Sequence, residues 1–143
     1  MPGMKSYVLD SYAVLTYFQN EKGADQVEEM LRDAVQGKVT LFLSTVNLGE
    51  VVYITQRKVG EEGRHKLLSA LQLLPITVID ADRDLALLAA GIKAEHAISY
   101  ANCFALALAL QSGGTVITGD PEFKKAEKIA PIIWLPEKPK QKP

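Results

Sequence analysis

Short apolar runs rich in β-branched residues alternate along this chain with longer segments of helical periodicity. The runs "SYVLD", "VTLFLS", "ITVID", "TVIT" and "PIIWLP" begin at residues 6, 39, 76, 115 and 131. Strands that alternate with helices form a parallel sheet, because each parallel connection needs a crossover. Continuous apolar runs also indicate strands that are buried on both faces. We therefore predict an α/β fold with three layers, α/β/α, around a central parallel sheet.

The segment after the second run predicts two helices. The stretch "VNLGEVVYITQRKV" has helical periodicity up to Gly60, and "EEGRHKLLSALQLL" continues the periodicity to Pro75. Two helices that meet at a glycine predict a helical hairpin between the second and third strands. Because the sequence has no internal repeat and no linker, we expect a single domain over residues 1–136. Residues 137–143 are rich in Pro and Lys, which predicts a disordered tail.

The overall composition narrows the class of protein. With 48% hydrophobic and 23% charged residues, the chain has the make-up of a globular domain. Its net charge of −1 lacks the basic excess of a nucleic-acid binder, so contact with nucleic acid must be local or metal-mediated. The start of the chain has no signal-peptide pattern, and Cys103 is the one cysteine. No apolar segment approaches the roughly 18 to 20 residues that span a bilayer, so we expect a cytoplasmic protein and no membrane contact.

Four polar residues lie where a sheet of this kind gathers functional groups. Asp10 ends the first run, and Asp120 follows the run at residues 115–118. Glu50 and Asn102 lie near the starts of two predicted helices. Functional groups in open parallel sheets collect beyond the carboxyl ends of the strands. The topology therefore predicts that these residues meet at one edge of the sheet.

Helix capping competes with function as an explanation for three of these residues. Asp10 can cap the helix that follows it, and Asp120 precedes a proline in a common type of helix start. Asn102 lies three residues after Ser99 and can act as its capping-box partner. Glu50 resists this explanation, because it lies one turn inside a helix among apolar residues. Such an acid needs either solvent or a partner.

Four segments resemble the sequence blocks of PIN domains, in order and at the normal spacing. They are "YVLDSYAVLTYF", "STVNLGEVVY", "AISYANCFALALAL" and "TVITGDPEF", and the resemblance covers the chain up to Pro136. The length and the predicted helical hairpin are similar to the VapC-type toxins of prokaryotic toxin–antitoxin pairs. The resemblance implies a metal-dependent endoribonuclease that uses Mg²⁺ or Mn²⁺ to activate a water for attack on a phosphodiester. It also implies an RNA substrate, an antitoxin partner and, by analogy, a homodimer.

The resemblance assigns roles to individual residues. Asp10 matches the acid that ends the first strand, Glu50 the acid inside the following helix, and Asp120 the acid of the "TGD" block. Thr118 matches a supporting hydroxyl, and Ser11 matches a small polar residue often found after the first acid. Mg²⁺ prefers oxygen ligands and retains several waters, so a ring of carboxylates beside an open position suits it. Such an ion can stabilise both the attacking and the leaving oxygen of an in-line displacement.

Asn102 is the departure from the family pattern. The third block usually reads "SYAD", and here it reads "SYAN", so an amide stands where a metal-binding carboxylate is expected. An amide keeps an oxygen that can coordinate a cation, but it carries no charge and presents an NH₂ donor. We therefore expect weaker metal binding and reduced or absent activity. Three interpretations stay open: a domain that binds RNA or a protein without cutting, an enzyme that needs only the other three acids, and a residue changed deliberately.

Basic residues near the turn of the predicted hairpin are candidates for contact with RNA. They are Arg57, Lys58, Arg64 and Lys66. Their side chains can reach phosphates, although solvated helix ends explain the same pattern.

A phosphoacceptor domain also places an aspartate after its first strand. Sites of the dehalogenase type need a second aspartate two residues later, where Tyr12 stands. Receiver domains need a lysine after the late strand, and "TGDPEF" has none. The sequence therefore favours the PIN interpretation over this class.

Overall fold

A five-stranded parallel sheet forms the centre of the fold in the computed structural model, which describes residues 4–136. Its strands lie in the order β3-β2-β1-β4-β5, and every pairing is parallel. They are β1 (Lys5–Leu9), β2 (Val39–Ser44), β3 (Ile76–Ile79), β4 (Thr115–Thr118) and β5 (Ile132–Trp134). The prediction of a tail at 137–143 lies outside the described residues.

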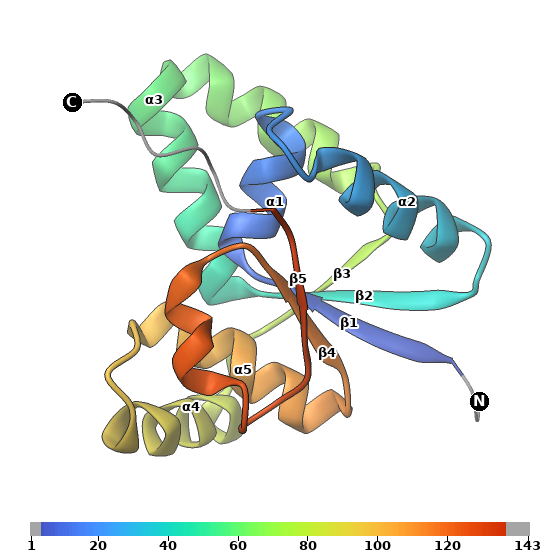
Figure 1. The fold of residues 1–143 in the computed structure, drawn as a ribbon. Helices are drawn as coiled ribbons and strands as arrows, with labels where there is room; N and C mark the ends of the chain where they lie inside the picture. Colours follow the sequence, from blue (N-terminus) through green and yellow to red (C-terminus); the bar gives the residue numbers. More distant parts are fainter. Residues whose placement is uncertain (1–3, 137–143) are drawn as a thin grey trace.

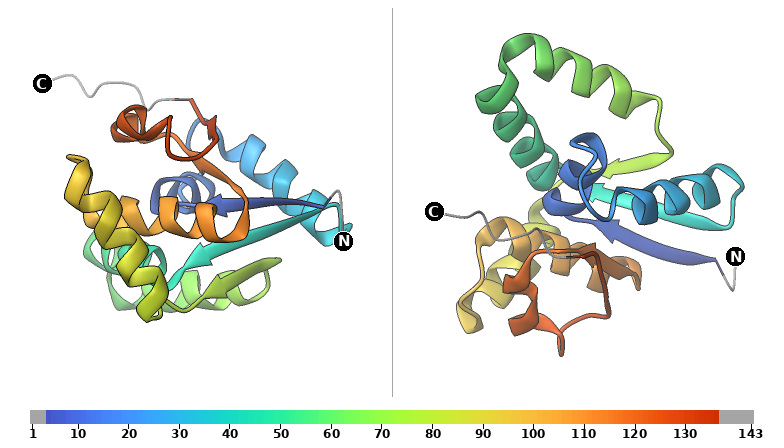
Figure 2. Two further views of the ribbon diagram at one scale, coloured as in Figure 1. Left: turned by 90° about the horizontal axis from the view of Figure 1, so that it is seen from below. Right: turned by 45° about the horizontal axis from the view of Figure 1, so that its top comes forward.

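Helices cover both faces of this sheet (Figure 1, Figure 2). One face carries α1 (Ser11–Phe18), α2 (Ala24–Val35) and α3 (Thr45–Gln72). The other face carries α4 (Arg83–Glu95), α5 (Tyr100–Ser112) and the short 3₁₀ helix η1 (Pro121–Ala126). The predicted fold class, three layers around a parallel sheet, is confirmed. No helix within residues 4–136 is long and apolar enough to cross a membrane.

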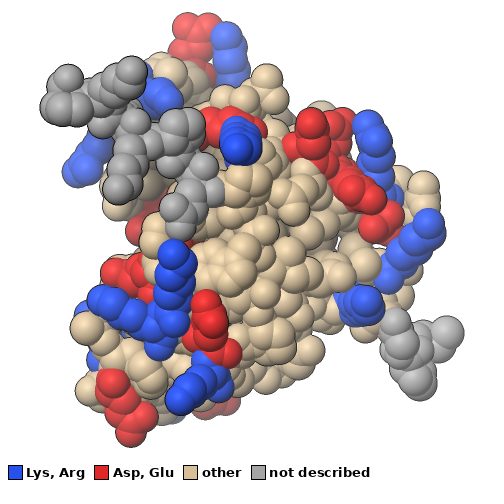
Figure 3. All heavy atoms as spheres, in the orientation of Figure 1, with Lys and Arg blue, Asp and Glu red and all other residues tan. Residues whose placement is uncertain are grey.

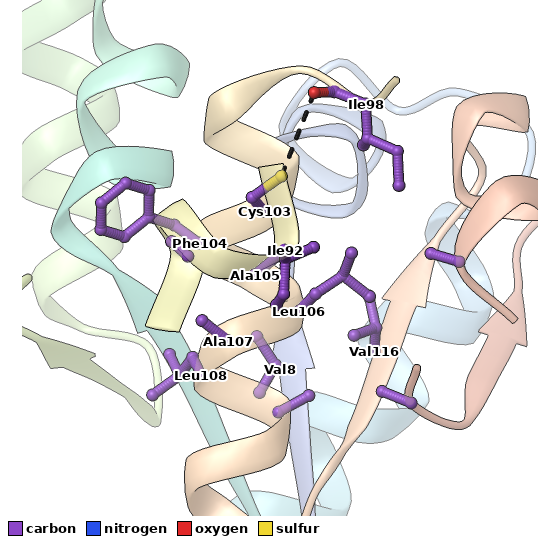
Figure 4. Packing of buried hydrophobic residues seen from close by; sticks show 14 of the residues in the cluster. Val8, Ile92, Ile98, Cys103, Phe104, Ala105, Leu106, Ala107, Leu108 and Val116 are labelled. Atoms are coloured by element: carbon purple, nitrogen blue, oxygen red, sulfur yellow. Dashed lines mark hydrogen bonds between the residues drawn. The ribbon is translucent and has the colours of Figure 1, made fainter. Parts of the chain in front are cut away.

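Two hydrophobic clusters flank the sheet, and neighbouring residues of each central strand enter opposite clusters. Val8 packs in the cluster around α5, whereas Leu9 packs in the cluster beneath α1 and α3. Val116 and Ile117 divide between the clusters in the same way. This alternation follows from the two-residue period of a strand. Figure 4 shows Val8 and Val116 pointing from the sheet into the cluster around α5.

Helix α5 is apolar on every side because it is enclosed on every side over two turns. All residues from Asn102 to Ala109 are buried. The helix lies between the sheet and α4, and it also touches α3. A helix without a polar stripe is expected only in such a position. Its burial fixes the place of Asn102, which lies in its first turn.

The predicted helical hairpin is present as two helical halves of α3 that meet at Gly60. Gly60 has φ 77° and ψ −174°, which interrupts the helix. The second half therefore turns away and runs back toward β3 (Figure 1). This backbone region is almost exclusive to glycine, because a Cβ atom clashes there with the main chain.

We predict that Gly60→Ala lowers the free energy of unfolding by about 1 to 3 kcal/mol, because alanine is strained in this backbone conformation. Gly91→Ala is the matched control. Gly91 lies inside α4, and a Cβ atom there would meet nothing within 4 Å. The control should raise the free energy of unfolding by roughly 0.5 to 1 kcal/mol. Urea unfolding of the two variants tests the contrast, and equal effects would contradict it.

Candidate active site

The candidate site lies beyond the carboxyl ends of β1 and β4, the point where the strand order reverses. From β1 the chain passes to β2 on one side, while β4 pairs with β1 on the other side. Asp10 directly follows β1, and Asp120 lies two residues after the end of β4. Ligands of open α/β sheets bind in the crevice at such a reversal.

Asp10 is buried and uses both carboxylate oxygens. Its side chain is 1% exposed. Oδ1 accepts a hydrogen bond of 2.8 Å from the Ala13 backbone N–H, which caps α1, and Oδ2 accepts one from the Thr118 hydroxyl. Capping therefore accounts for only one of the two oxygens. Burial raises the pKa of Asp10 to about 7, although the hydrogen bonds from Thr118 and Ala13 lower it. The charges of Asp120 and Glu50 raise it further.

Thr118 links Asp10 to Asp120. Its hydroxyl donates to Asp10 and accepts a hydrogen bond of 2.9 Å from the Asp120 backbone N–H. Asp120 Oδ1 in turn accepts from the Glu122 N–H at 2.9 Å and caps η1. Gly119 lies between the two and packs against Tyr12: a Cβ atom at this glycine would be 2.3 Å from the ring. A side chain at this position would therefore have to displace the Tyr12 ring.

Glu50 is held by a partner rather than by solvent alone. The hydroxyl of Ser11, the residue after Asp10, donates a hydrogen bond to Glu50 Oε1. Ser11 Oγ also accepts from Asn47 Nδ2 at 3.2 Å. Ser11 and Glu50, which were predicted separately as site residues, are therefore in direct contact beside Asp10.

Asn47 is a buried member of the site that sequence reasoning missed. Its side chain is fully buried and joins three helices. Nδ2 donates to Ser11 Oγ in α1 and, at 3.2 Å, to the Ala101 carbonyl in α5. Oδ1 accepts from Ser44 Oγ at 2.8 Å. Its only signal in the sequence is its place three residues after Ser44, which is an ordinary position in a capped helix.

Asn102 faces two carboxylates, and only half of the capping box predicted with Ser99 is present. The Asn102 backbone N–H donates to Ser99 Oγ at 3.3 Å, but the Asn102 side chain turns to the carboxylates instead of to the Ser99 N–H. Its Nδ2 donates to Asp120 Oδ2 at 3.1 Å and to Glu122 Oε1 at 2.9 Å. The Ser99 backbone N–H donates instead to Glu122 Oε1, at 2.6 Å. Glu122 thus fills the capping role from another element. Its only signal in the sequence was its place as the second acid of "TGDPEF".

Glu122 is the second residue that sequence reasoning missed. Burial acts to raise the pKa of Glu122, but hydrogen bonds from Ser99 and Asn102 outweigh it and hold the pKa below the usual value for a glutamate. The carboxylate therefore stays charged at neutral pH. It extends the chain of polar contacts from Asp120 to the start of α5.

The candidate RNA-binding residues do not form one group. Arg57 lies seven residues after Glu50 on α3, which places both on one helix face. Its guanidinium lies 5.0 Å from the ring centroid of Tyr53. Arg64 donates to Gln56 across the bend, while Lys58 and Lys66 line a cavity of about 500 Å³ beside α1. On the face drawn in Figure 3, acidic and basic side chains are interspersed.

The oxygens of the site suit a divalent cation only in part. Asp10, Glu50 and Asp120 supply carboxylate oxygens, the donor type that Mg²⁺ prefers. Asn102 turns its NH₂ group, which cannot coordinate, toward Asp120. Within residues 4–136, no three acidic, histidine or cysteine side chains are placed so as to hold a metal ion. Three of the four predicted ligands therefore fit a cation in chemical type, and Asn102 in this orientation does not.

Comparison with known proteins identifies the family. The family model of the PIN domain matches residues 7–129. The chain belongs to the PIN domain family. PIN domains are generally nucleases. A comparison with curated protein sequences found no match.

Several solved structures with a similar fold come from toxin–antitoxin systems. VapBC2 of Rickettsia felis, bound to a promoter DNA fragment, has a TM-score of 0.71 and 16% identity, and the match covers 91% of this chain and 98% of that chain. VapC20 of Mycobacterium tuberculosis, a toxin that cleaves the sarcin–ricin loop, has a TM-score of 0.67 and 15% identity. That match covers 84% of this chain and 94% of the VapC20 chain. DNA-bound VapBC of Salmonella typhimurium has a TM-score of 0.68 and 18% identity, and the match covers 91% of this chain and 98% of that chain. The predicted membership of the PIN domain family is confirmed, and the fold is similar to that of VapC structures.

We predict that the metal-free protein loses stability as the pH rises from about 4 to about 7. The pKa of Asp10 is 3.8 in an unperturbed chain and about 7 in the fold. Within this window the folded state therefore holds a proton that the unfolded chain has released, so a higher pH favours unfolding. This one group contributes a slope of at most about 1.4 kcal/mol per pH unit.

Urea unfolding in metal-free buffer at several pH values tests this prediction. Asp10→Asn is the matched variant, because it keeps the shape of the side chain and removes the titrating group. Its stability should vary less with pH than that of the unchanged protein. Equal pH dependence in both would contradict the assignment to Asp10.

Proposed function

We propose that this PIN domain is a divalent-metal-dependent endoribonuclease, the toxin of a toxin–antitoxin pair, with metal binding weakened by Asn102. The observation that carries the proposal is the set of linked carboxylates at the β1/β4 reversal. Thr118 joins Asp10 to Asp120, and Ser11 joins the same corner to Glu50. Carboxylates gathered at the reversal of a parallel sheet are the donor type that phosphodiester chemistry with a divalent cation uses.

Asp10, Glu50 and Asp120 are the residues that would hold Mg²⁺ or Mn²⁺. When bound, the cation supplies a polarised water and neutralises charge on the phosphate. The protein orients the ligands: Thr118 fixes Asp10 Oδ2, and Ser11 fixes Glu50 Oε1. Such supporting hydrogen bonds hold ligands in place and tune their affinity for the metal. Because each hydroxyl comes from a strand end or a helix start, the carboxylates are positioned by the fold itself.

Arg57 and Tyr53 extend the proposed site along α3. Tyr53 is 45% exposed and carries the Arg57 guanidinium over its ring. An exposed tyrosine can stack on an unpaired base, and an adjacent arginine can contact phosphate. Arg57 shares a helix face with Glu50, so an RNA strand on this face would run from the carboxylates toward Arg57.

The proposal of an antitoxin partner rests on the similar folds. The structures from Rickettsia felis and Salmonella typhimurium are VapBC complexes, and one from Klebsiella pneumoniae is a toxin–antitoxin complex. VapC20 of Mycobacterium tuberculosis cleaves the sarcin–ricin loop, an RNA. By analogy we assign this domain a structured RNA substrate, an antitoxin protein, a cytoplasmic location and homodimer formation.

A noncatalytic binding module is the second candidate, and Asn102 favours it. The amide donates a hydrogen bond to Asp120 Oδ2 and another to Glu122 Oε1. A domain that keeps the fold and satisfies its own acids in this way can bind RNA or a protein without cutting. The two candidates differ in their response to divalent metal.

RNA cleavage across a titration of Mg²⁺ and Mn²⁺ tests the proposal. We predict that Asn102→Asp lowers the metal concentration for half-maximal cleavage by at least about tenfold, because one more charge strengthens the site. Adding Asp10→Asn to that variant should abolish cleavage. If none of the three proteins cuts RNA at any metal concentration, the nuclease proposal fails and the binding module takes its place.

We predict that Arg57→Ala raises KM and leaves kcat nearly unchanged. Loss of one phosphate contact should also reduce the slope of log affinity against log salt by about 0.7, the value for a single strand. Arg83→Ala is the control, because Arg83 is an exposed residue at the start of α4, on the opposite face of the sheet. Both variants are compared in Asn102→Asp protein. Equal salt slopes would place the RNA elsewhere.

A further inference from the structure

The Asn102 amide lies between two carboxylates of the site. Its NH₂ group donates one hydrogen bond of 3.1 Å to Asp120 and one of 2.9 Å to Glu122. The side chain is buried, with 7% exposure. An amide nitrogen has two hydrogens, so these two contacts use its full donor capacity. The geometry is that of a neutral bridge between two anions.

Two neighbouring carboxylates that are partly withdrawn from water repel each other unless a donor or a cation lies between them. A carboxylate at position 102, as in the usual family pattern, would make a third anion at this point. That arrangement would need a cation, or a proton on one of the three acids. Asn102 removes one charge and supplies the missing donors in the same step.

We infer that the Asn102 amide replaces a cation as the bridge between Asp120 and Glu122, so that this side of the site is assembled without metal. Glu122 is the positioning residue that holds the bridge. Its Oε1 accepts from both Asn102 Nδ2 and the Ser99 N–H, at 2.9 and 2.6 Å. One oxygen thereby ties η1 to the first turn of α5.

The bridge acts on the proposed metal site from one side. The Asn102 amide shares Asp120 Oδ2 with any cation bound there and draws electron density from that oxygen, so Asn102 raises the concentration of metal that the site needs. Only this consequence rests on the proposed function. The bridge itself is a property of the free protein and is measurable without RNA.

Thermal unfolding in EDTA and in millimolar Mg²⁺ provides the first test. The unchanged protein should have nearly the same midpoint in both. Asn102→Asp should unfold roughly 4 °C or more lower in EDTA and recover in Mg²⁺. The matched control is Asn20→Asp, the same substitution at an exposed site in the turn after α1, which should show no response to Mg²⁺. If the unchanged protein gains as much from Mg²⁺ as Asn102→Asp does, the amide does not replace a cation.

Variants of Glu122 test its positioning role. Glu122→Gln keeps an oxygen that accepts from Ser99 and Asn102, so its midpoint in EDTA should stay near that of the unchanged protein. Glu122→Ala removes the acceptor and should lower the midpoint in EDTA and in Mg²⁺ alike. Glu127→Ala, an exposed acid just after η1, is the control. Equal midpoints for Glu122→Ala and Glu127→Ala would overturn the assignment.

The exchange of amide and carboxylate gives a readout that a general loss of packing would not produce. In the double variant Asn102→Asp with Glu122→Gln, the amide at position 122 can donate to the carboxylate at position 102. The double variant should therefore recover part of the stability in EDTA that Asn102→Asp loses. No recovery would contradict the bridge. Because no RNA is used, absence of nuclease activity would remove the proposed function and leave this inference standing.

Discussion

The hydrogen bond from the Thr118 hydroxyl to the buried Asp10 carboxylate joins the two central strands where the order of the sheet reverses. A buried carboxylate is costly unless its oxygens are satisfied, and this bond satisfies one of them while the start of α1 satisfies the other. The hydroxyl of the same threonine accepts a hydrogen bond from the Asp120 backbone N–H. The acidic corner is therefore an extension of the sheet, and strand pairing determines where its charges lie.

The polar contacts around this corner also hold the helices to one another. Asn47 connects α1, α3 and α5 from a fully buried position, and Glu122 connects η1 to α5. Buried polar groups that are fully hydrogen-bonded specify one arrangement among several that an apolar core would tolerate. Fold and site thus depend on the same side chains, and a change in one of them acts on both.

Local sequence patterns predicted the helices and strands well, because each pattern lies within a few neighbouring residues. Asp10 at a strand end and Gly60 at the bend are of this kind. The partner of Asn102 was missed because a capping rule considers only residues within one helix. Glu122 belongs to η1 and lies twenty residues further along the chain. Asn47 carried no signal beyond its place three residues after Ser44, since its contacts with Ser11 and Ala101 exist only after three helices have packed. The family resemblance supplied the position of the acids but not the hydrogen bonds among them.

Helix α5 is completely buried over the residues that follow Asn102. Packing therefore fixes the shape of the site there, whereas its charge can change. A helix enclosed by a sheet and other helices cannot shift to accommodate a larger or smaller side chain without loss of packing. Asparagine and aspartate have nearly the same volume, and a single base change interconverts their codons. The one variation at this position that leaves the packing unchanged is therefore a change of charge. A lineage that carries this fold can gain or lose a charge here in one mutational step, in either direction, with its architecture unchanged.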